Sequence, residues 1–373
     1  MVFDRNMSLL DFIQNQQKES INSLKLRKMS NINSHTSVHG MYPYRGKISS
    51  IYANSIISQF KSGLTLLDPF CGSGTIVYEA YSKGLNVIGI DNNPLAIFLS
   101  TGKMSLVGLN KSQTLKKAKD LVNLAKNLKN PPNLPQDCSK AFHIKSGEEI
   151  MRLAYFFNQM PDFIKSIFCG TICLIARGCN HYMWTSTTVG KNINPKRYIS
   201  VFEKFIQKVE KHFYPLNAIG SCNIFKYDSR NLDDLIRKKS INYVFTSPPY
   251  FDGLDYTSYY AKFIYSILNF DRKEIRKHLI QNVRTYQQDM KQVLTKLINV
   301  TKDDALIIFV VGDKKLPDNR IIKGGEFFSK IIHHKPAKIL NSNYTSTPSR
   351  LIFDKLNRTQ REEQIIIWDK SMW

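Results

Sequence analysis

Residues 64–75 read LTLLDPFCGSGT and combine an apolar run with a turn of small residues. The apolar run ending in Asp68 is typical of a strand buried on both faces of a parallel sheet. Gly72 and Gly74 allow backbone conformations that larger residues avoid and let a ligand approach the main chain closely. A helix is expected to begin at about Gly74, where its N-terminus would offer unpaired N–H groups. The stretch therefore predicts a strand, a ligand-binding turn and a helix.

The same rhythm continues along the chain. Further apolar runs that end in polar turns occur at 86–91, 222–228, 242–249 and 305–313. Helical patterns lie between them, at 74–83, 93–104 and 286–301. Alternating strands and helices favour an α/β fold, a doubly wound and mostly parallel sheet.

Two regions depart from this rhythm. In the C-terminal part, 337–345 and 350–354 resemble short strands or loops and 364–369 a last strand, which together predict an antiparallel hairpin on the sheet edge. Residues 105–220 hold helical patterns at 112–128, 147–158, 161–177 and 198–213, with Pro/Asn-rich loops at 129–136 and 190–197. We interpret 105–220 as an inserted, mainly helical subdomain.

Acidic residues end two of the predicted strands. Asp91 ends the strand after the glycine turn, about 20 residues on, where a carboxylate would accept hydrogen bonds from ribose hydroxyls. Asp228 ends a later strand and is a candidate partner for an adenine amino group. The turn lacks the third glycine of the dinucleotide fingerprint, and no GK[ST] is present for a triphosphate. A tight turn without any ligand is the alternative interpretation.

A second motif, TSPPY at 246–250, also follows an apolar strand and should lie at the carboxyl edge of the sheet, where ligands bind. Two prolines stiffen the backbone and leave carbonyls free to accept hydrogen bonds. Tyr250 adds a flat face for stacking. A proline-rich loop that merely ends a strand is the competing interpretation.

These groups suit chemistry on an aromatic amino nitrogen, which is a poor nucleophile because its lone pair is delocalised. Acceptors at Ser247 and at the Pro248 carbonyl would favour a pyramidal nitrogen whose lone pair points at a methyl sulfonium. Alignment and preorganised dipoles would lower the barrier, with neither a metal nor a covalent enzyme intermediate.

Composition narrows the class of protein. The 53 Lys and Arg against 30 Asp and Glu give a net charge of +23, which favours a polyanionic partner, although a generally basic chain is an alternative. The six cysteines form no CxxC pair or zinc spacing, so we expect reduced, mostly buried thiols. No leader pattern or apolar run of roughly 20 residues occurs, so we expect a cytoplasmic protein with no membrane partner.

DPFCGSGT and TSPPY together resemble the cofactor and catalytic motifs of the DNA amino-methyltransferase family. Within that family, Ser before the two prolines is the form associated with cytosine-N4 methylation, whereas adenine-N6 enzymes more often carry Asp or Asn. The segment HGMYPYRGKISSIYANSII, 39–57, is similar to the N-terminal cofactor segment of the family. The resemblance implies a Rossmann-like fold that binds S-adenosyl-L-methionine.

The resemblance also implies roles for individual residues. Those expected to bind the cofactor are Tyr44, Lys47, Asp68, Pro69, Phe70, Cys71, Gly72, Ser73, Gly74, Thr75, Asp91, Asn92 and Asp228. Those expected around a flipped target base are Ser247, Pro248, Pro249 and Tyr250. Cys71 is expected to be a small thiol in a turn, because no Pro-Cys pair of the kind used to attack a cytosine ring carbon occurs. No metal site is expected.

The domain organisation expected from these motifs has four parts: an N-terminal arm at 1–34, a cofactor-binding half at 35–104, the inserted subdomain at 105–220 and a catalytic half at 221–373. The insertion precedes the Asp228 strand, unlike the usual place of a target-recognition domain. Target recognition is one hypothesis for it, motivated by His181, Tyr182, Trp184, Lys191, Lys196, Arg197 and Tyr198. A purely structural helical cap is the other.

Three functions follow from the sequence. The first is a cytosine-N4 DNA methyltransferase, acting in restriction-modification or self-marking alongside a partner restriction endonuclease. The second is methylation of adenine-N6 in DNA or of an RNA base. The third is a catalytically silent nucleic-acid-binding protein, which would have no need of the complete set of motif residues.

Overall fold

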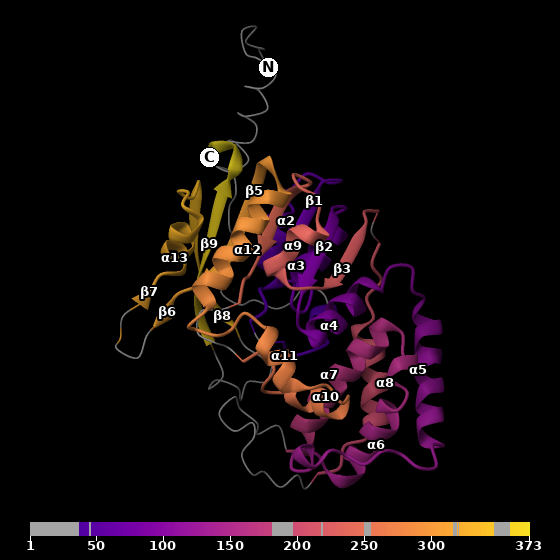
Figure 1. The fold of residues 1–373 in the computed structure, drawn as a ribbon. Helices are drawn as coiled ribbons and strands as arrows, with labels where there is room; N and C mark the ends of the chain where they lie inside the picture. The colour runs from indigo at the N-terminus through magenta and orange to yellow at the C-terminus, as the bar shows by residue number, and fades with distance from the viewer. Residues whose placement is uncertain are drawn as a thin grey trace.

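The computed structural model describes residues 37–44, 46–180, 197–217, 219–249, 255–315, 319, 321–346 and 359–373. A sheet with helices on both faces forms one end of the molecule, and a helical region forms the other (Figure 1). None of the helices in the described part of the chain has the length and apolar character that crossing a bilayer requires.

The main sheet has seven strands in the order β3-β2-β1-β4-β5-β9-β8. Its parallel strands are β1 (Thr65–Asp68), β2 (Asn86–Asp91), β3 (Cys222–Lys226), β4 (Ile241–Thr246) and β5 (Thr301–Gly312). The antiparallel pair at one edge is β8 (Lys338–Ser346) and β9 (Thr359–Asp369), with β9 next to β5. The predicted mostly parallel sheet with a C-terminal antiparallel hairpin is therefore confirmed. A separate two-stranded ribbon joins β6 (Lys314–Lys315) and β7 (Ile321–Ile322).

Alternating side chains of the strands fill a core on each face of the sheet, as expected for strands buried on both sides. In β1, Leu66 belongs to one core and Leu67 to the other, and both are fully buried. The helices that contribute to the first core are α2 (Ser50–Ile57), α3 (Thr75–Ser82) and α4 (Pro94–Met104). Those over the second are α9 (Leu232–Leu235), α12 (Tyr286–Val300) and α13 (Gly324–Ile332).

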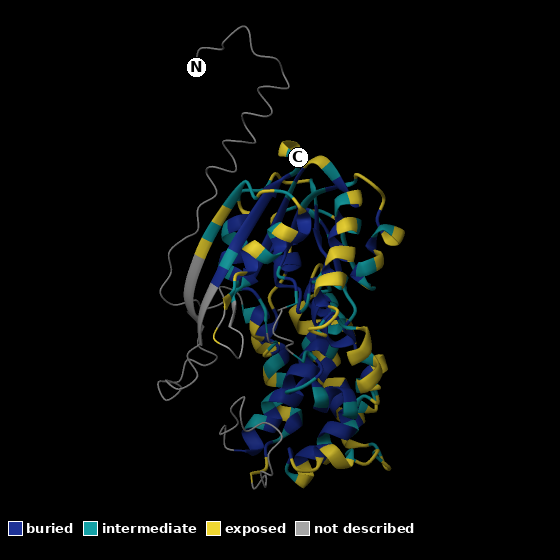
Figure 2. Cartoon of the chain, turned by 60° about the vertical axis from the view of Figure 1, so that its left-hand side comes forward, coloured by how far each residue is buried: buried dark blue, intermediate teal, exposed yellow. Residues whose placement is uncertain are grey.

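Beyond α4 the chain forms a group of helices. Their bounds are α5 (Lys111–Lys126), α6 (Ile144–Ala154), α7 (Asp162–Cys179) and α8 (Val201–His212). Gly102 lets α7 approach α4 closely, because a Cβ there would lie 1.8 Å from Ser166 Oγ. Buried side chains of this group, such as Phe163 and Phe168, join the first core, so the buried interior runs from sheet to helices (Figure 2).

The role of 105–220 stays a prediction. Five residues proposed for target recognition, from His181 to Lys196, lie outside the described residues, as does the N-terminal arm 1–34. The sequence did not predict two short helices, α10 (Ala261–Ile267) and α11 (Arg272–His278). Helix α10 contacts α7 of the helical group, and α11 lies nearer the sheet (Figure 1).

The strand order reverses between β1 and β4. The chain runs outward from β1 through β2 to β3, and then returns to the other side of β1 as β4. Loops after β1 and β4 therefore part in opposite directions, and the crevice between them is where ligands bind in sheets of this kind. A bond from Thr246 Oγ1 to Asp68 Oδ1, 2.7 Å long, joins the two strand ends at this point.

Candidate functional site

A pocket at the carboxyl edge of the parallel strands brings most of the predicted site residues together. The residues predicted for cofactor binding or catalysis that line it are Tyr44, Lys47, Asp68, Phe70, Cys71, Gly72, Ser73, Thr75, Asp91, Asn92, Asp228, Ser247 and Pro249. Three others, Pro69, Gly74 and Pro248, are not among the residues that line the pocket, and Tyr250 lies outside the described residues. Segments from both halves of the chain thus share one cavity.

The turn after β1 has a backbone that only glycine tolerates well. Gly72 and Gly74 have φ of +50° and +72°, in the left-handed region that disfavours other residues. Gly74 is also the N-cap of α3 and packs against α4, since a Cβ there would lie 2.9 Å from Ser100 Cα. Gly74 therefore shapes the turn from behind the pocket.

Asp91 joins this turn to the end of β2. Its carboxylate accepts hydrogen bonds from the N–H groups of Gly72, at 2.9 Å, and Asn93, at 2.8 Å. Burial raises the pKa of this carboxyl to about 6, even though both N–H groups favour the charged form. A carboxylate has about four acceptor positions, so Asp91 keeps capacity for ligand hydroxyls in the pocket.

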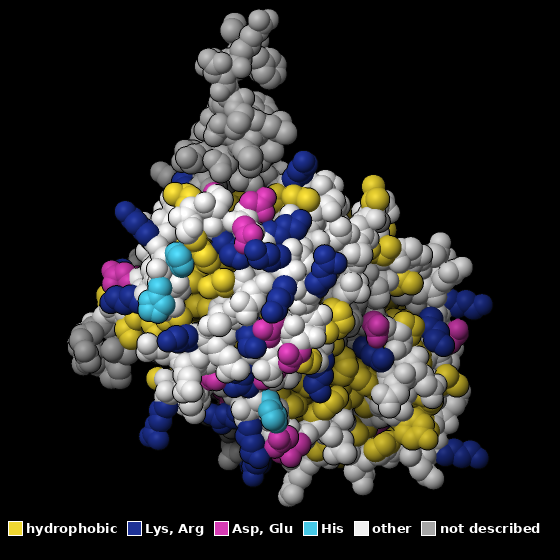
Figure 3. All heavy atoms as spheres, turned by 45° about the horizontal axis from the view of Figure 1, so that its top comes forward, with side chains coloured by type: hydrophobic (Ala, Val, Ile, Leu, Met, Phe, Trp, Pro, Cys, Tyr) yellow, Lys and Arg dark blue, Asp and Glu magenta, His cyan; other side chains and the backbone are white. Residues whose placement is uncertain are grey.

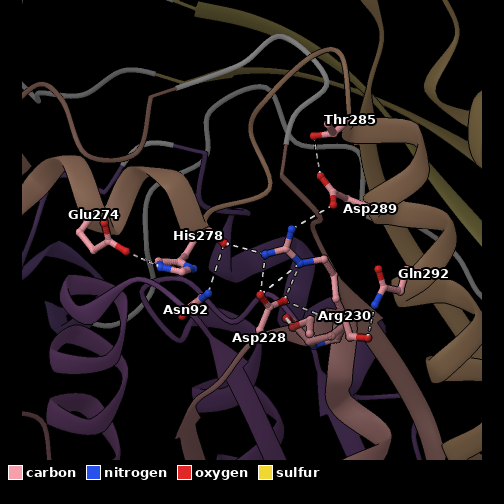
Figure 4. A network of polar contacts seen from close by, with 10 residues as sticks. Asn92, Asp228, Arg230, Glu274, His278, Thr285, Asp289 and Gln292 are labelled. Atoms are coloured by element: carbon pink, nitrogen blue, oxygen red, sulfur yellow. Dashed lines mark hydrogen bonds and ion pairs between the residues drawn. The ribbon is translucent and has the colours of Figure 1, made fainter.

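Asp228 lies in the pocket wall, but its carboxylate is already engaged. Arg230 donates to it from the backbone N–H at 3.0 Å, from Nε at 3.0 and 3.1 Å, and from Nη2 at 2.6 Å (Figure 4). This ion pair was not predicted from the sequence, although an Arg two residues after the Asp was a visible signal. A role of Asp228 toward adenine stays a prediction.

Among the buried polar atoms that have no hydrogen-bond partner within the described residues, three belong to residues that line the pocket. They are Ser73 Oγ, Thr75 Oγ1 and Asn93 Nδ2. Buried polar atoms are normally satisfied, so these three fit a polar ligand that reaches into the pocket. Asn93 is oriented by its Oδ1, which accepts from Leu95 N at 2.9 Å and Tyr265 Oη at 2.5 Å.

Aromatic and aliphatic side chains form another part of the wall. The rings of Tyr44 and Tyr256 stack, with 6.5 Å between centroids and 26° between planes. Leu279 and Ile280 line the pocket as well. The sequence carried no signal for these two, because they come from the loop after α11, far along the chain from the glycine turn. Such surfaces suit the flat face of a nucleoside base.

The segment after β4 is held from outside. Ser247 and Pro249 line the pocket, and the Pro249 carbonyl accepts a 2.6 Å bond from Tyr286 Oη, at the start of α12. Tyr286 is only 2 % exposed. This tyrosine was not predicted as a site residue, since nothing local connects it to the prolines.

A buried polar cluster supports Lys47. Its Nζ donates to the His39 carbonyl at 2.7 Å, while the His39 ring contacts Glu79 Oε1 at 2.8 Å and Lys103 Nζ at 3.3 Å. Burial, with help from the charge of Lys103, lowers the pKa of His39 to about 3. The sequence segment that begins at His39 is thereby fixed beside the pocket.

Cys71 also lines the pocket, and burial raises the pKa of its thiol well above the usual range. A thiolate is the nucleophilic form of cysteine. The burial agrees with a small thiol in a turn.

Residues 45–130 match the UPF0020 family, described as an RMKL-like methyltransferase domain. The chain is 24% identical over 388 residues to the type II methyltransferase M.MjaII of Methanocaldococcus jannaschii, covering 74% of this chain and 72% of that protein. It is 24% identical over 287 residues to M.BsoBI of Geobacillus stearothermophilus, where 66% of this chain covers 55% of that protein, about half its length.

Solved structures similar to this chain include the rRNA methyltransferase aviRa from Streptomyces viridochromogenes, with 13% identity, a TM-score of 0.37 and 90% of each chain covered. Another is a SAM-dependent methyltransferase from Methanosarcina mazei, with 11% identity, a TM-score of 0.35, and 83% of this chain and 92% of that chain covered. The matched domain and the two type II relatives confirm the predicted resemblance: the chain is similar to type II DNA methyltransferases. It is an S-adenosyl-L-methionine-dependent methyltransferase.

Proposed function

We propose that this methyltransferase modifies the exocyclic N4 amino group of cytosine in DNA. One observation carries the proposal: Ser247 and Pro249 stand in the wall of the same pocket as the glycine turn and Asp91. A cofactor bound along the turn would therefore present its sulfonium side to the segment after β4.

The residues of the pocket fit S-adenosyl-L-methionine, which supplies an electrophilic methyl group when bound. Asp91 would accept hydrogen bonds from the ribose hydroxyls. The unpartnered hydroxyls of Ser73 and Thr75 would bind the polar amino-acid end. The stacked and aliphatic side chains around Tyr256 and Leu279 would exclude water from the nucleoside.

The segment after β4 would hold the target amino group. Ser247 Oγ and the Pro248 carbonyl would accept its two N–H groups, which directs the nitrogen lone pair at the methyl carbon. Methyl transfer would form the N–C bond at the expense of the S–C bond, leave S-adenosylhomocysteine with the electron pair of that bond, and release one amino proton to solvent. Tyr286 already engages the Pro249 carbonyl, so that carbonyl braces the segment. The contribution of these groups is alignment and a preorganised field.

DNA as the substrate is supported by charge near the pocket. Figure 3 shows basic side chains distributed over the face in view with acidic ones among them, so total charge alone does not locate a binding surface. Helix α11, however, leads directly into the pocket wall at 278–280 and carries Arg272, Lys273, Arg276 and Lys277. Cations there would contact phosphates beside an extruded base.

The choice of cytosine comes from the family resemblance of Ser247, and the setting of restriction-modification or self-marking with a partner endonuclease comes from the type II relatives. Transfer of a labelled methyl group to DNA, followed by nucleoside analysis, tests the methyl transfer and the choice of base. N4-methylcytosine is the expected product. N6-methyladenine, or a product in RNA only, would replace the substrate, and DNA binding without any transfer would favour a silent binding protein.

Variants test the residues. Tyr250→Ala and Pro248→Ala should each lower turnover strongly and leave the cofactor dissociation constant nearly unchanged, because both residues are assigned to the target base and not to the cofactor. Normal turnover in either would contradict the pocket assignment. Asp91→Ala should instead raise the cofactor dissociation constant. 2-Aminopurine at the target position should brighten on binding, since base extrusion removes its stacking.

A further inference from the structure

We propose that Arg230 is a positioning residue that clamps residues 278–280 onto the cofactor pocket, as a wall that opens for the cofactor to bind and to leave. The inference rests on the cofactor site and does not depend on which nucleic-acid base is methylated.

Arg230 ties three separate elements together (Figure 4). Its guanidinium holds Asp228, which follows β3, and its Nη1 donates to Asp289 Oδ1 of α12 at 3.0 Å. Its Nη2 also donates to the His278 carbonyl at 3.2 Å, at the end of α11. A planar fork that is always charged is suited to bridging several acceptors in a fixed geometry.

The His278 carbonyl is a shared anchor. Asn92 Nδ2, from the loop after β2, donates to the same oxygen at 3.2 Å. Asn92 and Asp228 both line the pocket, and so do His278, Leu279 and Ile280. The two donors therefore draw this backbone against the pocket from the sides of β2 and β3.

Polar contacts and one half-buried side chain, Ile275, hold this wall on its N-terminal side. No residue of α11 is buried. The helix is tied to Asp255 by Arg272 at 3.1 Å and by Arg276 at 3.6 Å. Ile275 of α11 is half-buried and packs against the first core, and Ile280, at the far end of the wall, is buried in the second. Segments with few buried apolar contacts open at low free-energy cost, so loss of Arg230 should release 278–279 while Ile280 stays anchored.

The arrangement gives Asp228 a second task. Its carboxylate and that of Asp289 flank the guanidinium, and all three side chains are at most 23% exposed. An ion pair shielded to this extent is screened less than a surface pair. Asp228 therefore orients Arg230 as well as bordering the pocket, and replacing either one would loosen the wall.

The test measures binding of S-adenosylhomocysteine, which needs neither DNA nor catalysis. Arg230→Gln should raise its dissociation constant about tenfold or more, the scale of one charge-assisted hydrogen bond. The dissociation constant of Arg230→Lys should lie between those of wild type and Arg230→Gln, because the lysine ammonium keeps the positive charge but cannot reproduce the planar array of donors of the guanidinium. Lys296→Gln is the matched control. Lys296 lies on α12, as Asp289 does, and the substitution breaks its 3.0 Å pair with Asp233 of α9; neither Lys296 nor Asp233 lines the pocket.

Hydrogen–deuterium exchange separates a clamp from a general structural role. Peptides spanning 276–284 should exchange faster in Arg230→Gln than in wild type or Lys296→Gln, while peptides from β1 and β4 stay unchanged. S-adenosylhomocysteine should slow exchange of the same peptides in wild-type protein. If Arg230→Gln does not fold, Asp289→Asn should show the same changes to a smaller degree.

Wild-type peptides 276–284 that the ligand does not protect would overturn the proposal. So would an Arg230→Gln protein, or Asp289→Asn where the former is unfolded, that binds S-adenosylhomocysteine like the control. Wild-type protein that fails to bind S-adenosylhomocysteine would overturn the cofactor site and the clamp together. If the Arg230 variants behave as expected but the wild-type protein does not methylate DNA, this inference is supported and only the proposed substrate is contradicted.

Discussion

Two loops face each other across the switch point, and they are held in different ways. The turn at 70–75 is shaped by its own glycines and by Asp91, which ends the neighbouring strand. The segment at 247–249 is braced by Tyr286 of α12. This helix covers the face of the sheet opposite to that covered by α3, the helix that follows the turn. The first loop is a local structure with a nearby support, whereas the second depends on a distant one.

The contrast teaches where each function is vulnerable. The cofactor turn should be most sensitive to substitutions of its glycines, because few other residues adopt positive φ values. The catalytic segment should be most sensitive to loss of Tyr286, which supports it from α12, and less sensitive to changes in its own backbone. Four predictions test this difference.

The largest loss of stability caused by a substitution is expected at Gly74. Gly74→Ala combines a left-handed φ of +72° with a Cβ 2.9 Å from Ser100 Cα. We expect the free energy of unfolding, measured by chemical denaturation, to fall by about 2–4 kcal/mol. Gly63→Ala is the control, since Gly63 has φ of +78° and nothing within 4 Å of its Cβ. An equal loss in both variants would remove packing against α4 from the explanation.

Two tyrosines that differ in the loop they support form the second test. Tyr286→Phe removes the donor to Pro249 and should lower kcat about tenfold, with little change in cofactor affinity. Tyr265→Phe removes the donor to Asn93 and should raise the cofactor dissociation constant by about as much, with a smaller change in kcat. Each variant loses one buried hydroxyl. Identical kinetic changes in the two proteins would mean that the loops are not supported separately.

Asp68, which joins the two loops, should make stability depend on pH. Burial raises its pKa from 3.8 to about 7, so between these values the folded state keeps a proton that the unfolded state has released. Stability therefore decreases as pH rises through this window, by roughly 1.4 kcal/mol per pH unit. Asp68→Asn keeps an acceptor for Thr246 and does not titrate. A constant difference in unfolding free energy between the two apo proteins from pH 4 to 7 would contradict the raised pKa.

The smallest effect is expected at the surface of α11. Lys273→Gln combined with Lys277→Gln should weaken DNA binding and reduce the slope of log K against log salt by about 0.9 for each phosphate that the protein no longer neutralises. Lys116→Gln with Lys119→Gln, on the exposed side of α5, removes the same charge elsewhere. Equal slopes for the two double variants would show that α11 is not the phosphate-binding surface.

Local patterns predicted much of the fold. The five parallel strands lie within a few residues of the apolar runs, because each run is long enough to define a strand buried on both faces. Helix α3 follows the glycine turn as expected. Helix α11 was missed, since it buries no residue and thus shows no apolar stripe. The same absence of burial underlies the proposed opening of its pocket wall.

Within the site, contacts between residues close in the sequence could be predicted, whereas contacts between distant residues could not. The turn and Asp91 lie within one strand–helix–strand unit, so their spacing carried information. Arg230 was visible two residues from Asp228, but its reach to Asp289 and His278 was not. Leu279, Ile280 and Tyr286 arrive from segments without any motif.

The sequence by itself determined the strand–helix alternation, the glycine turn and the two chemical motifs, because these depend on backbone conformation and on apolar periodicity within short segments. Only the tertiary structure decided that the motifs share one pocket, that Arg230 pairs with the Asp228 carboxylate and that Tyr286 donates a hydrogen bond to the Pro249 carbonyl. Those relations depend on how distant segments pack. The sequence around a side chain does not indicate which residue from a distant segment it will contact.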